Sequence, residues 1–322
     1  MHHLCFQEID VVVNKKLGIA AGIMAGALWG LVFLAPELTP KFSPLQLSAG
    51  RYLAYGVVAL LLVAPSWRSL VSRVSWIEWK ALIWLSLTGN IVYYVFVAKA
   101  VQEGGIAMTS IVIGLLPVVV TVIGSRDKHA VPLRQLLPSL GLSAAGLLCI
   151  SWQTLTSPGH GSVTGLLCAI GALISWTAYA VSNSRWLVKL HAISSHEWSL
   201  LTGLVTGLQA IVLAIPAFLF SAPAESSSGW ISFTSIVVGV AILCSVIGNG
   251  FWNYASRALP LTLTGQMIVF ETIFAAFYGF LWEQRWPTVG EGAAMALLIA
   301  GVVSCAAVHR PKQNKAPHQT SA

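Results

Sequence analysis

Aromatic rings and side-chain amides lie together inside the most apolar parts of this sequence. Six rings and four amides share this setting: Trp29, Tyr93, Tyr94, Trp176, Tyr179, Trp252, Asn90, Asn183, Asn249 and Asn253. An indole or phenol buried in an apolar medium needs a hydrogen-bond partner, and side-chain amides can supply one. We therefore expect a pocket for a flat, amphipathic small molecule, in which the rings stack and the amides orient the solute.

The spacing of two pairs supports this pocket. Trp176 and Tyr179 are three residues apart, as are Asn249 and Trp252. On a helix, residues three apart share a face, so each pair would point into the same space. The alternative for any single residue is that the amide joins two helices and the ring fills volume. Either role suits one residue, whereas the whole set favours the pocket.

Two further residues are unusual within apolar segments. Glu271 is a carboxylate near the centre of an apolar segment, where a bare charge is costly. It could couple the protein to protons, or balance the ammonium group of a solute; the alternative is a neutral, hydrogen-bonded strut. Pro117 removes a backbone hydrogen bond from another apolar segment and should kink it. That kink could be a hinge or a static bend.

These residues need elements that hold them in a membrane. The chain has 322 residues, of which 56% are apolar and only 9% charged. Its mean hydropathy is +0.78. A soluble protein carries about 25% charged residues, so too few are present to cover a water-exposed surface. Each crossing of a hydrocarbon core takes about 20 helical residues, and ten crossings fit this length.

Ten apolar windows are separated by turn formers or charges. They span roughly 17–35, 45–64, 79–99, 104–124, 133–151, 162–182, 197–219, 230–250, 262–282 and 288–308. Backbone groups in lipid must be satisfied within a segment, so these windows predict helices. With the amino terminus inside, fourteen of the 18 basic residues fall on the cytoplasmic side and three on the opposite side, while Arg51 lies within the second window. The tails 1–16 and 309–322 are therefore predicted to be cytoplasmic.

Several other functions conflict with the composition. The basic residues never form a continuous stripe, which argues against nucleic-acid binding. The five cysteines lack CxxC spacing, and the eight histidines fall in tails or loops. We therefore expect no cofactor and no metal site. The expected partners are a small-molecule substrate and the lipid bilayer, and a monomer is compatible with the sequence.

The two halves of the chain resemble each other. Matching pairs recur at offsets of 147, 151, 159 and 155 residues: Trp29 with Trp176, Ser43 with Ser194, Asn90 with Asn249, and Gly146 with Gly301. This drift suggests that residues 17–151 and 162–308 are two copies of a five-helix unit. Because five is odd, the second copy would be inverted in the membrane. Inverted repeats allow one central site to open to alternate sides.

Several motifs in this sequence resemble those of a known family. The matching features are Ala27-Leu28-Trp29-Gly30, Arg51, Leu116-Pro117-Val118, Glu271, Trp282-Glu283 and Gly301. They are similar to the drug/metabolite transporter superfamily, in its branch of ten helices and two tandem five-helix repeats. Residues 174–179 with Asn183, and Phe251-Trp252-Asn253, look like the bacterial aromatic amino-acid exporters. One departure is Leu116, where that subfamily would have an aromatic residue.

The resemblance implies an all-α inner-membrane protein that exports small amphipathic metabolites by alternating access, above all aromatic or other neutral amino acids. One alternative is export of other metabolites or drugs within the same superfamily. A polytopic membrane enzyme is a second alternative, although it would need clustered acid, base or nucleophilic groups near one membrane face. A receptor or scaffold would be expected to carry a soluble appendage, and no connection between windows exceeds roughly 15 residues.

Overall fold

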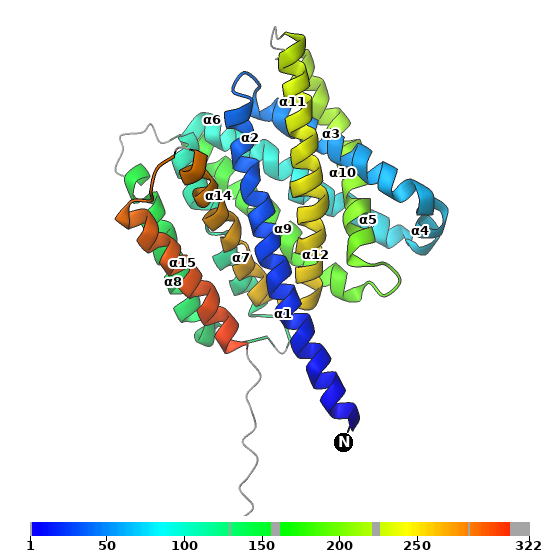
Figure 1. The fold of residues 1–322 in the computed structure, drawn as a ribbon, viewed down its shortest axis with the longest axis vertical. Helices are drawn as coiled ribbons and strands as arrows, with labels where there is room; N and C mark the ends of the chain where they lie inside the picture. Colours follow the sequence, from blue (N-terminus) through cyan, green and yellow to red (C-terminus); the bar gives the residue numbers. More distant parts are fainter. Residues whose placement is uncertain (1, 129, 156–161, 221–225, 283, 310–322) are drawn as a thin grey trace, which may run out of the picture.

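A computed structural model describes residues 2–128, 130–155, 162–220, 226–282 and 284–309, and all regular secondary structure in these ranges is helical (Figure 1). In chain order the elements are α1 (His2–Gly30), η1 (Leu31–Leu34), α2 (Ala35–Leu38), α3 (Pro44–Val63), η2 (Ala64–Ser66), α4 (Trp67–Arg73), α5 (Trp76–Ser86), η3 (Leu87–Ile91), α6 (Val92–Ile113), α7 (Leu116–Gly124), α8 (Leu133–Leu155), α9 (Val163–Lys189), α10 (Ser195–Leu219), α11 (Ser227–Val240), η4 (Ala241–Gly248), α12 (Asn249–Ala258), α13 (Leu261–Met267), α14 (Val269–Trp282) and α15 (Val289–Val308). The elements η3 and η4 are π-helical, whereas η1 and η2 are 3-10 turns.

Among the described residues, eight helical segments are long and apolar enough to cross a membrane. They are Lys15–Leu34, Leu45–Arg73, Trp76–Ala100, Val163–Lys189, Ser195–Leu219, Ser227–Ala258, Leu261–Trp282 and Val289–Val308. These segments correspond to eight of the ten expected windows. Leu133–Cys149 is a shorter apolar helix in the fifth window. An all-helical membrane protein is thus supported, whereas ten crossings stay a prediction.

The fourth window differs from the expected pattern. Helix α6 runs without a break through residues 99–104, where the sequence suggested a boundary between two spans. The interruption comes later, at Gly114 and Leu115, and Pro117 lies in the first turn of α7. Proline is favoured there because the first helical N–H groups need no partner within the helix. The expected distortion near Pro117 is therefore a break between two helices.

Two long helices begin with the same local motif. Ser43 accepts a hydrogen bond from the backbone N–H of Gln46, whose side chain accepts one from the Ser43 N–H. Ser194 and Glu197 make the same reciprocal pair at the start of α10. Such capping boxes satisfy backbone donors that the helix leaves free. Both pairs lie at the offset of 151 residues that relates the two halves.

Helices of the two halves pair across the molecule. Helix α3 packs along α10, α6 along α9, α8 along α15, and α7 on α13, while α1 packs against both α12 and α14. Figure 1 shows α8 and α15 on one flank, α3 and α4 on the other, and α1, α9 and α12 between them. The two halves therefore interdigitate, and the centre of the molecule lies among α1, α9 and α12.

Glycines allow the closest of these contacts. A Cβ atom on Gly26 of α1 would lie 2.5 Å from Phe270 Cβ, and one on Gly30 would lie 2.9 Å from the Ala275 nitrogen. Gly26 and Gly30 of α1 thus form a packing surface against α14. Helices α3 and α10 cross at Gly56 and Gly207, where an added Cβ on Gly56 would lie 2.6 Å from Gly207 Cα.

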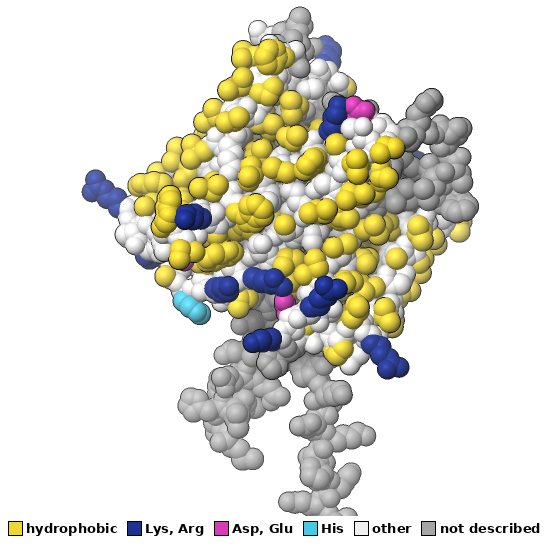
Figure 2. Space-filling model, turned by 180° about the vertical axis from the view of Figure 1, so that it is seen from behind, with side chains coloured by type: hydrophobic (Ala, Val, Ile, Leu, Met, Phe, Trp, Pro, Cys, Tyr) yellow, Lys and Arg dark blue, Asp and Glu magenta, His cyan; other side chains and the backbone are white. Residues whose placement is uncertain are grey.

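The start of the first span and the end of the last span lie at the same end of the molecule. The Lys15 ammonium group donates a hydrogen bond to the His309 carbonyl oxygen. Figure 1 shows the beginning of α1 and the end of α15 at the lower end. Basic side chains gather at this end in the opposite view (Figure 2). Arg257 donates to the carbonyls of Leu190 and Ile193 and so caps the carboxyl end of α9.

Candidate functional site

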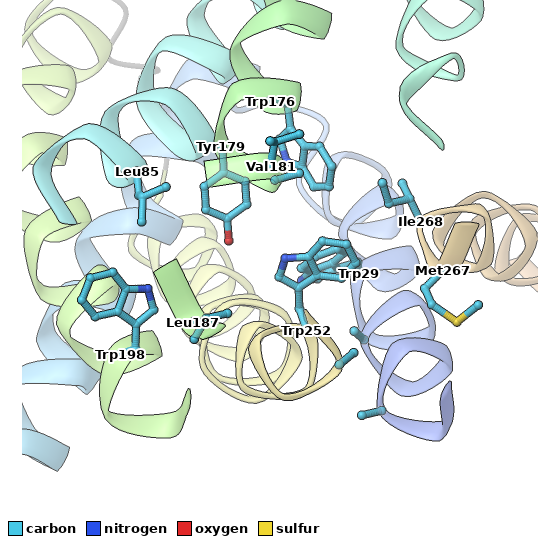
Figure 3. Close-up of a cluster of buried hydrophobic side chains, with 14 of the residues drawn as sticks. Trp29, Leu85, Trp176, Tyr179, Val181, Leu187, Trp198, Trp252, Met267 and Ile268 are labelled. Atoms are coloured by element: carbon cyan, nitrogen blue, oxygen red, sulfur yellow. The ribbon is translucent and has the colours of Figure 1, made fainter. Parts of the chain in front are cut away.

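Three indoles meet at the centre of the molecule. Trp29 lies near the end of α1, Trp176 on α9 and Trp252 on α12 (Figure 3). The ring centroids are 5.2 Å apart for Trp29 and Trp252, 5.9 Å for Trp176 and Trp252, and 6.4 Å for Trp29 and Trp176. These are ordinary distances for tilted and edge-to-face aromatic contacts. We call these three residues the indole cluster.

The indole cluster fills space in this conformation and does not stand apart around a solute. Its side chains are 8%, 8% and 1% exposed for Trp29, Trp176 and Trp252. Tyr179 extends the cluster, with its ring 5.7 Å from that of Trp176. Because these rings are in mutual contact, a solute could enter between α1, α9 and α12 at this point only if the rings separate.

The polar atoms of the indole cluster are only partly satisfied. The Trp29 indole N–H donates to the Cys244 carbonyl oxygen at 3.0 Å. The Trp252 indole nitrogen is buried and has no hydrogen-bond partner of ordinary geometry among the described residues. In Figure 3 it is turned toward the Tyr179 phenol. A buried donor without a good partner costs about 1–3 kcal/mol, so this group would gain from a polar ligand.

Two glycines in π-helical turns pack closely against rings of this site, those of Tyr179 and Trp29. Gly89 lies in η3, where an added Cβ would be 2.5 Å from the Tyr179 ring. Gly248 ends η4, where an added Cβ would be 3.1 Å from the Trp29 ring. Each glycine therefore allows a ring from the other half of the chain to pack closely against its backbone. π-Helical turns are often found at functional sites. Neither glycine was among the site residues predicted from the sequence, although each directly precedes an asparagine that was, Asn90 and Asn249.

Three of the four asparagines form hydrogen bonds that join helices. Asn183 of α9 donates to Asn253 of α12 at 2.8 Å and accepts from the Trp198 indole of α10 at 3.1 Å. Asn90 donates to the Thr206 hydroxyl at 3.0 Å.

Asn249, the remaining amide, lies within hydrogen-bonding reach of the Tyr55 hydroxyl, which donates to the Ser199 carbonyl. In this conformation Asn90, Asn183 and Asn253 thus have the helix-joining role that the sequence left as the alternative. No amide is placed against the indole cluster by these contacts.

Tyr93 and Tyr94 lie on α6, which packs along α9. Tyr93 is half-buried and close enough to Glu271 and Arg51 to interact electrostatically with both. Tyr94 lines a cavity of about 60 Å³ together with Ser48 and Arg51. The other residues that line this cavity are apolar: Val32, Ala35, Leu47, Val237 and Val240. We call this space the Arg51 cavity. Because it borders Ala35 and Leu47, it lies toward the end of the molecule opposite the chain termini.

Glu271 lies where four segments converge. An added Cβ on Gly26 of α1 would be 2.9 Å from its backbone nitrogen. Its carboxylate interacts electrostatically with Arg51 of α3, Tyr93 of α6 and Cys244 of η4. Among the described residues, this carboxylate forms neither a hydrogen bond nor an ion pair within 4.0 Å.

Arg51 is the residue that the sequence analysis missed as part of the site. Its Nε donates to the Ser245 hydroxyl at 2.9 Å, and its guanidinium lies 5.4 Å from the centre of the Tyr52 ring. A sequence signal was present, since Arg51 is the one basic residue that lies more than one residue from either end of its apolar window. Ionisable residues within membrane spans are functional candidates by default. The described residues hold no group of three or more histidine, cysteine, aspartate or glutamate side chains that could bind a metal.

Comparison with known proteins adds independent information. The model of the EamA-like transporter family matches residues 16–152 and again residues 163–306. The inner membrane protein YtfF of Escherichia coli (strain K12) is 31% identical over 306 residues, which cover 89% of this chain and 94% of that protein. The uncharacterized transporter YoaV of Bacillus subtilis (strain 168) is 23% identical, with 90% and 96% covered. An uncharacterized transporter of Archaeoglobus fulgidus is 26% identical, with 85% and 92% covered.

A solved crystal structure has the same fold. It superposes with a TM-score of 0.73 and covers 91% of this chain and 98% of its own chain, at 19% sequence identity. At this identity the similarity concerns the arrangement of the helices and not the substrate. The helical architecture described above is therefore one that an experimentally determined protein also adopts.

Proposed function

This chain belongs to the EamA-like transporter family of the drug/metabolite transporter superfamily, and from that premise we propose that it exports small amphipathic metabolites across the inner membrane, above all aromatic and other neutral amino acids. It is a multi-pass membrane transporter, and the family is one of transporters and not of enzymes. The inner-membrane location is supported by the name of the Escherichia coli relative. Export, as opposed to import, follows from the resemblance to aromatic amino-acid exporters.

Alternating access between two inverted five-helix repeats, residues 17–151 and 162–308, is the proposed mechanism. The family model matches the chain twice, over nearly these ranges. Gly56 and Gly207 are equivalent at the offset of 151 residues, and they touch. Trp29 and Trp176 are equivalent at 147, and their rings also meet. Equivalent residues meet on the axis that relates two repeats, so both contacts support a pseudo-twofold axis through the centre.

The proposed topology has ten crossings with both tails in the cytoplasm. The contact between Lys15 and His309 puts the start of the first span and the end of the last at one end of the molecule, as an even number of crossings requires. The gathering of basic side chains at this end favours the cytoplasm there (Figure 2). The Arg51 cavity would then lie in the outer half of the membrane.

The indole cluster is the observation that carries the proposed function. Three rings from both halves meet at the centre, so opening the passage requires α1, α9 and α12 to move relative to one another. A flat aromatic solute can replace the ring contacts that are lost when the rings separate. We propose that Trp29, Trp176, Tyr179 and Trp252 contact the solute in turn during this exchange. The break before Pro117 is a proposed hinge, and Glu271 a proposed proton-coupling group.

The experiment is flux through the purified protein in liposomes. Vesicles loaded with unlabelled phenylalanine are placed in labelled phenylalanine, and protein-free vesicles are the control. We expect saturable counterflow of the unmodified amino acid. Chemical conversion of the label would support an enzyme instead, and absence of flux for phenylalanine, tyrosine and tryptophan would refute this substrate class. A set of other metabolites and drugs, tested as competitors, would then identify the alternative cargo.

A further inference from the structure

Arg51 is charged and lies in an apolar segment that is long enough to span a membrane. The segment Leu45–Arg73 has a mean hydropathy of 1.7, and Arg51 is half-buried within it. A cation in such a place is costly unless it meets an anion or a wet cavity. Arg51 is therefore expected to have a counter-charge or a ligand.

The guanidinium is only partly satisfied within the chain. The one hydrogen bond found for it among the described residues joins Nε to the Ser245 hydroxyl. The two terminal nitrogens carry four N–H donors, arranged so that two of them match the oxygens of a carboxylate. Glu271 attracts Arg51 electrostatically, yet no nitrogen of Arg51 lies within 4.0 Å of its carboxylate oxygens. The donors remain available to a ligand.

The Arg51 cavity has the size and surroundings for a small anionic group. Its volume is about 60 Å³. A water molecule needs about 15 Å³ on this measure, so the space suits a group of three or four heavy atoms, but not an aromatic ring. Around Arg51 the walls are Ser48, Tyr94 and apolar side chains. Apolar walls strengthen the attraction between a guanidinium and an anion, because little water screens it.

We propose that Arg51 binds the carboxylate of the transported solute in this cavity. The inference rests on the proposed function, since it concerns the cargo of the same transporter. It names the chemical class more closely: the cargo carries a carboxylate, and an amine that lacks one is a poor substrate. Ser245 is a positioning residue, because its hydroxyl holds the guanidinium through Nε, so that the terminal nitrogens stay available to the ligand.

Three phenyl compounds isolate the carboxylate. Phenylalanine has a carboxylate and an ammonium group, 3-phenylpropionate has only the carboxylate, and phenethylamine only the ammonium. Each is tested as a competitor of labelled phenylalanine flux in proteoliposomes that contain the wild-type protein, Arg51→Gln or Arg51→Lys. Arg126→Gln is the matched control, because Arg126 is an exposed arginine outside the proposed site. Arg51→Lys keeps the charge but loses the paired donors.

We expect phenylalanine and 3-phenylpropionate to bind the wild-type protein and Arg126→Gln alike. In Arg51→Gln both should bind at least about tenfold more weakly, as expected for the loss of a charge-assisted hydrogen bond. Arg51→Lys should fall between the two, and phenethylamine should change less than about twofold. An equal loss for all three compounds, or no loss for the two carboxylates, would overturn the proposal.

A second measurement keeps the proposal testable without flux. A ligand that binds the folded state raises the midpoint of thermal unfolding, Tm, in detergent. We expect 3-phenylpropionate to raise the Tm of the wild-type protein but not that of Arg51→Gln. If the Tm of the wild-type protein shifts but no flux is found, amino-acid export is refuted and the carboxylate site is still supported. An identical Tm shift in the wild-type protein and in Arg51→Gln would overturn the site.

Two further arms of the thermal assay deal with other outcomes. Sodium chloride at equal concentration tests for a simple inorganic anion, and a chloride shift as large as that of 3-phenylpropionate would overturn the carboxylate assignment. If Arg51→Gln does not fold, Ser245→Ala gives the same readout through the positioning hydroxyl. We expect it to weaken carboxylate binding severalfold, and an unchanged carboxylate shift would count against the proposal.

Discussion

The crossing of α3 and α10 at Gly56 and Gly207 makes a quantitative prediction. Carbon atoms in contact lie about 3.5–4.0 Å apart. In Gly56→Ala the new Cβ would lie 2.6 Å from Gly207 Cα and 3.4 Å from the Gly207 nitrogen. The obstacle is the backbone of another helix, so no side-chain rotation can relieve it. Helices α3 and α10 must separate by about 1 Å at their crossing, a gap that forfeits roughly a quarter to a half of each dispersion contact there.

Such overpacking costs about 1–3 kcal/mol. Alanine also favours a helix over glycine by up to about 1 kcal/mol, which would hide part of the effect. Gly141→Ala is the matched control, because Gly141 is an exposed glycine of α8 and an added Cβ there would meet no atom within 4 Å. The helix preference is common to both variants and cancels. We therefore expect Gly56→Ala to be less stable than Gly141→Ala by about 1–3 kcal/mol.

The assay is thermal unfolding of the purified protein in one detergent, followed by circular dichroism. The expected difference corresponds to a Tm lower by on the order of 5 °C for Gly56→Ala. Gly207→Ala should behave like Gly56→Ala, because its Cβ would lie 2.5 Å from Gly56 Cα. In the double variant the two costs should be strongly non-additive, since both strain one crossing. Equal Tm values for Gly56→Ala and Gly141→Ala would refute this crossing of α3 and α10.

Three other predictions concern transport and pH. Trp176→Ala should reduce phenylalanine counterflow well below that of Trp67→Ala at equal folded protein, because Trp176 belongs to the indole cluster whereas Trp67 is 39% exposed at the end of its segment; equal losses would count against the cluster. Glu271→Gln should abolish stimulation of flux by a pH gradient while exchange persists, and retained stimulation would exclude Glu271 as the coupling group. Burial lowers the pKa of His309, beyond the last span, from its usual value of about 6.5. The folded state therefore resists protonation, so the stability present above about pH 6.5 is lost as the pH falls toward the folded pKa. His309→Gln should flatten this pH dependence of Tm, and an unchanged dependence would show that another group is responsible.

The sequence by itself determined the class of the protein and the extent of most helices. The expected window 197–219 is Ser195–Leu219 in the structure, and 288–308 is Val289–Val308. Such agreement is understandable, because the length and hydrophobicity of a membrane helix are set locally by the thickness of the hydrocarbon core and by backbone hydrogen bonding. The exception is the boundary near residues 99–104, which α6 crosses without a break. No strong turn former lies there apart from Gly104, so local pattern did not locate the turn at Gly114.

The site was predicted only as a set of candidates. Residue type and helical spacing indicated that Trp29, Trp176 and Trp252 were unusual, but their contacts join α1, α9 and α12, which are far apart in the chain. The same holds for Asn183, whose partners lie on α12 and α10. Which of several buried polar groups meet depends on how the helices cross.

Only the tertiary structure decided which side chains share the centre, because helix crossing angles and registers result from packing along whole helix surfaces, glycine contacts included. It brought the three indoles into contact, gave the amides partners on other helices, and placed Arg51 beside a cavity without an ion pair in the described residues. An apolar window in the sequence shows that a charge within it is costly to bury. It does not show where the groups that balance this charge lie.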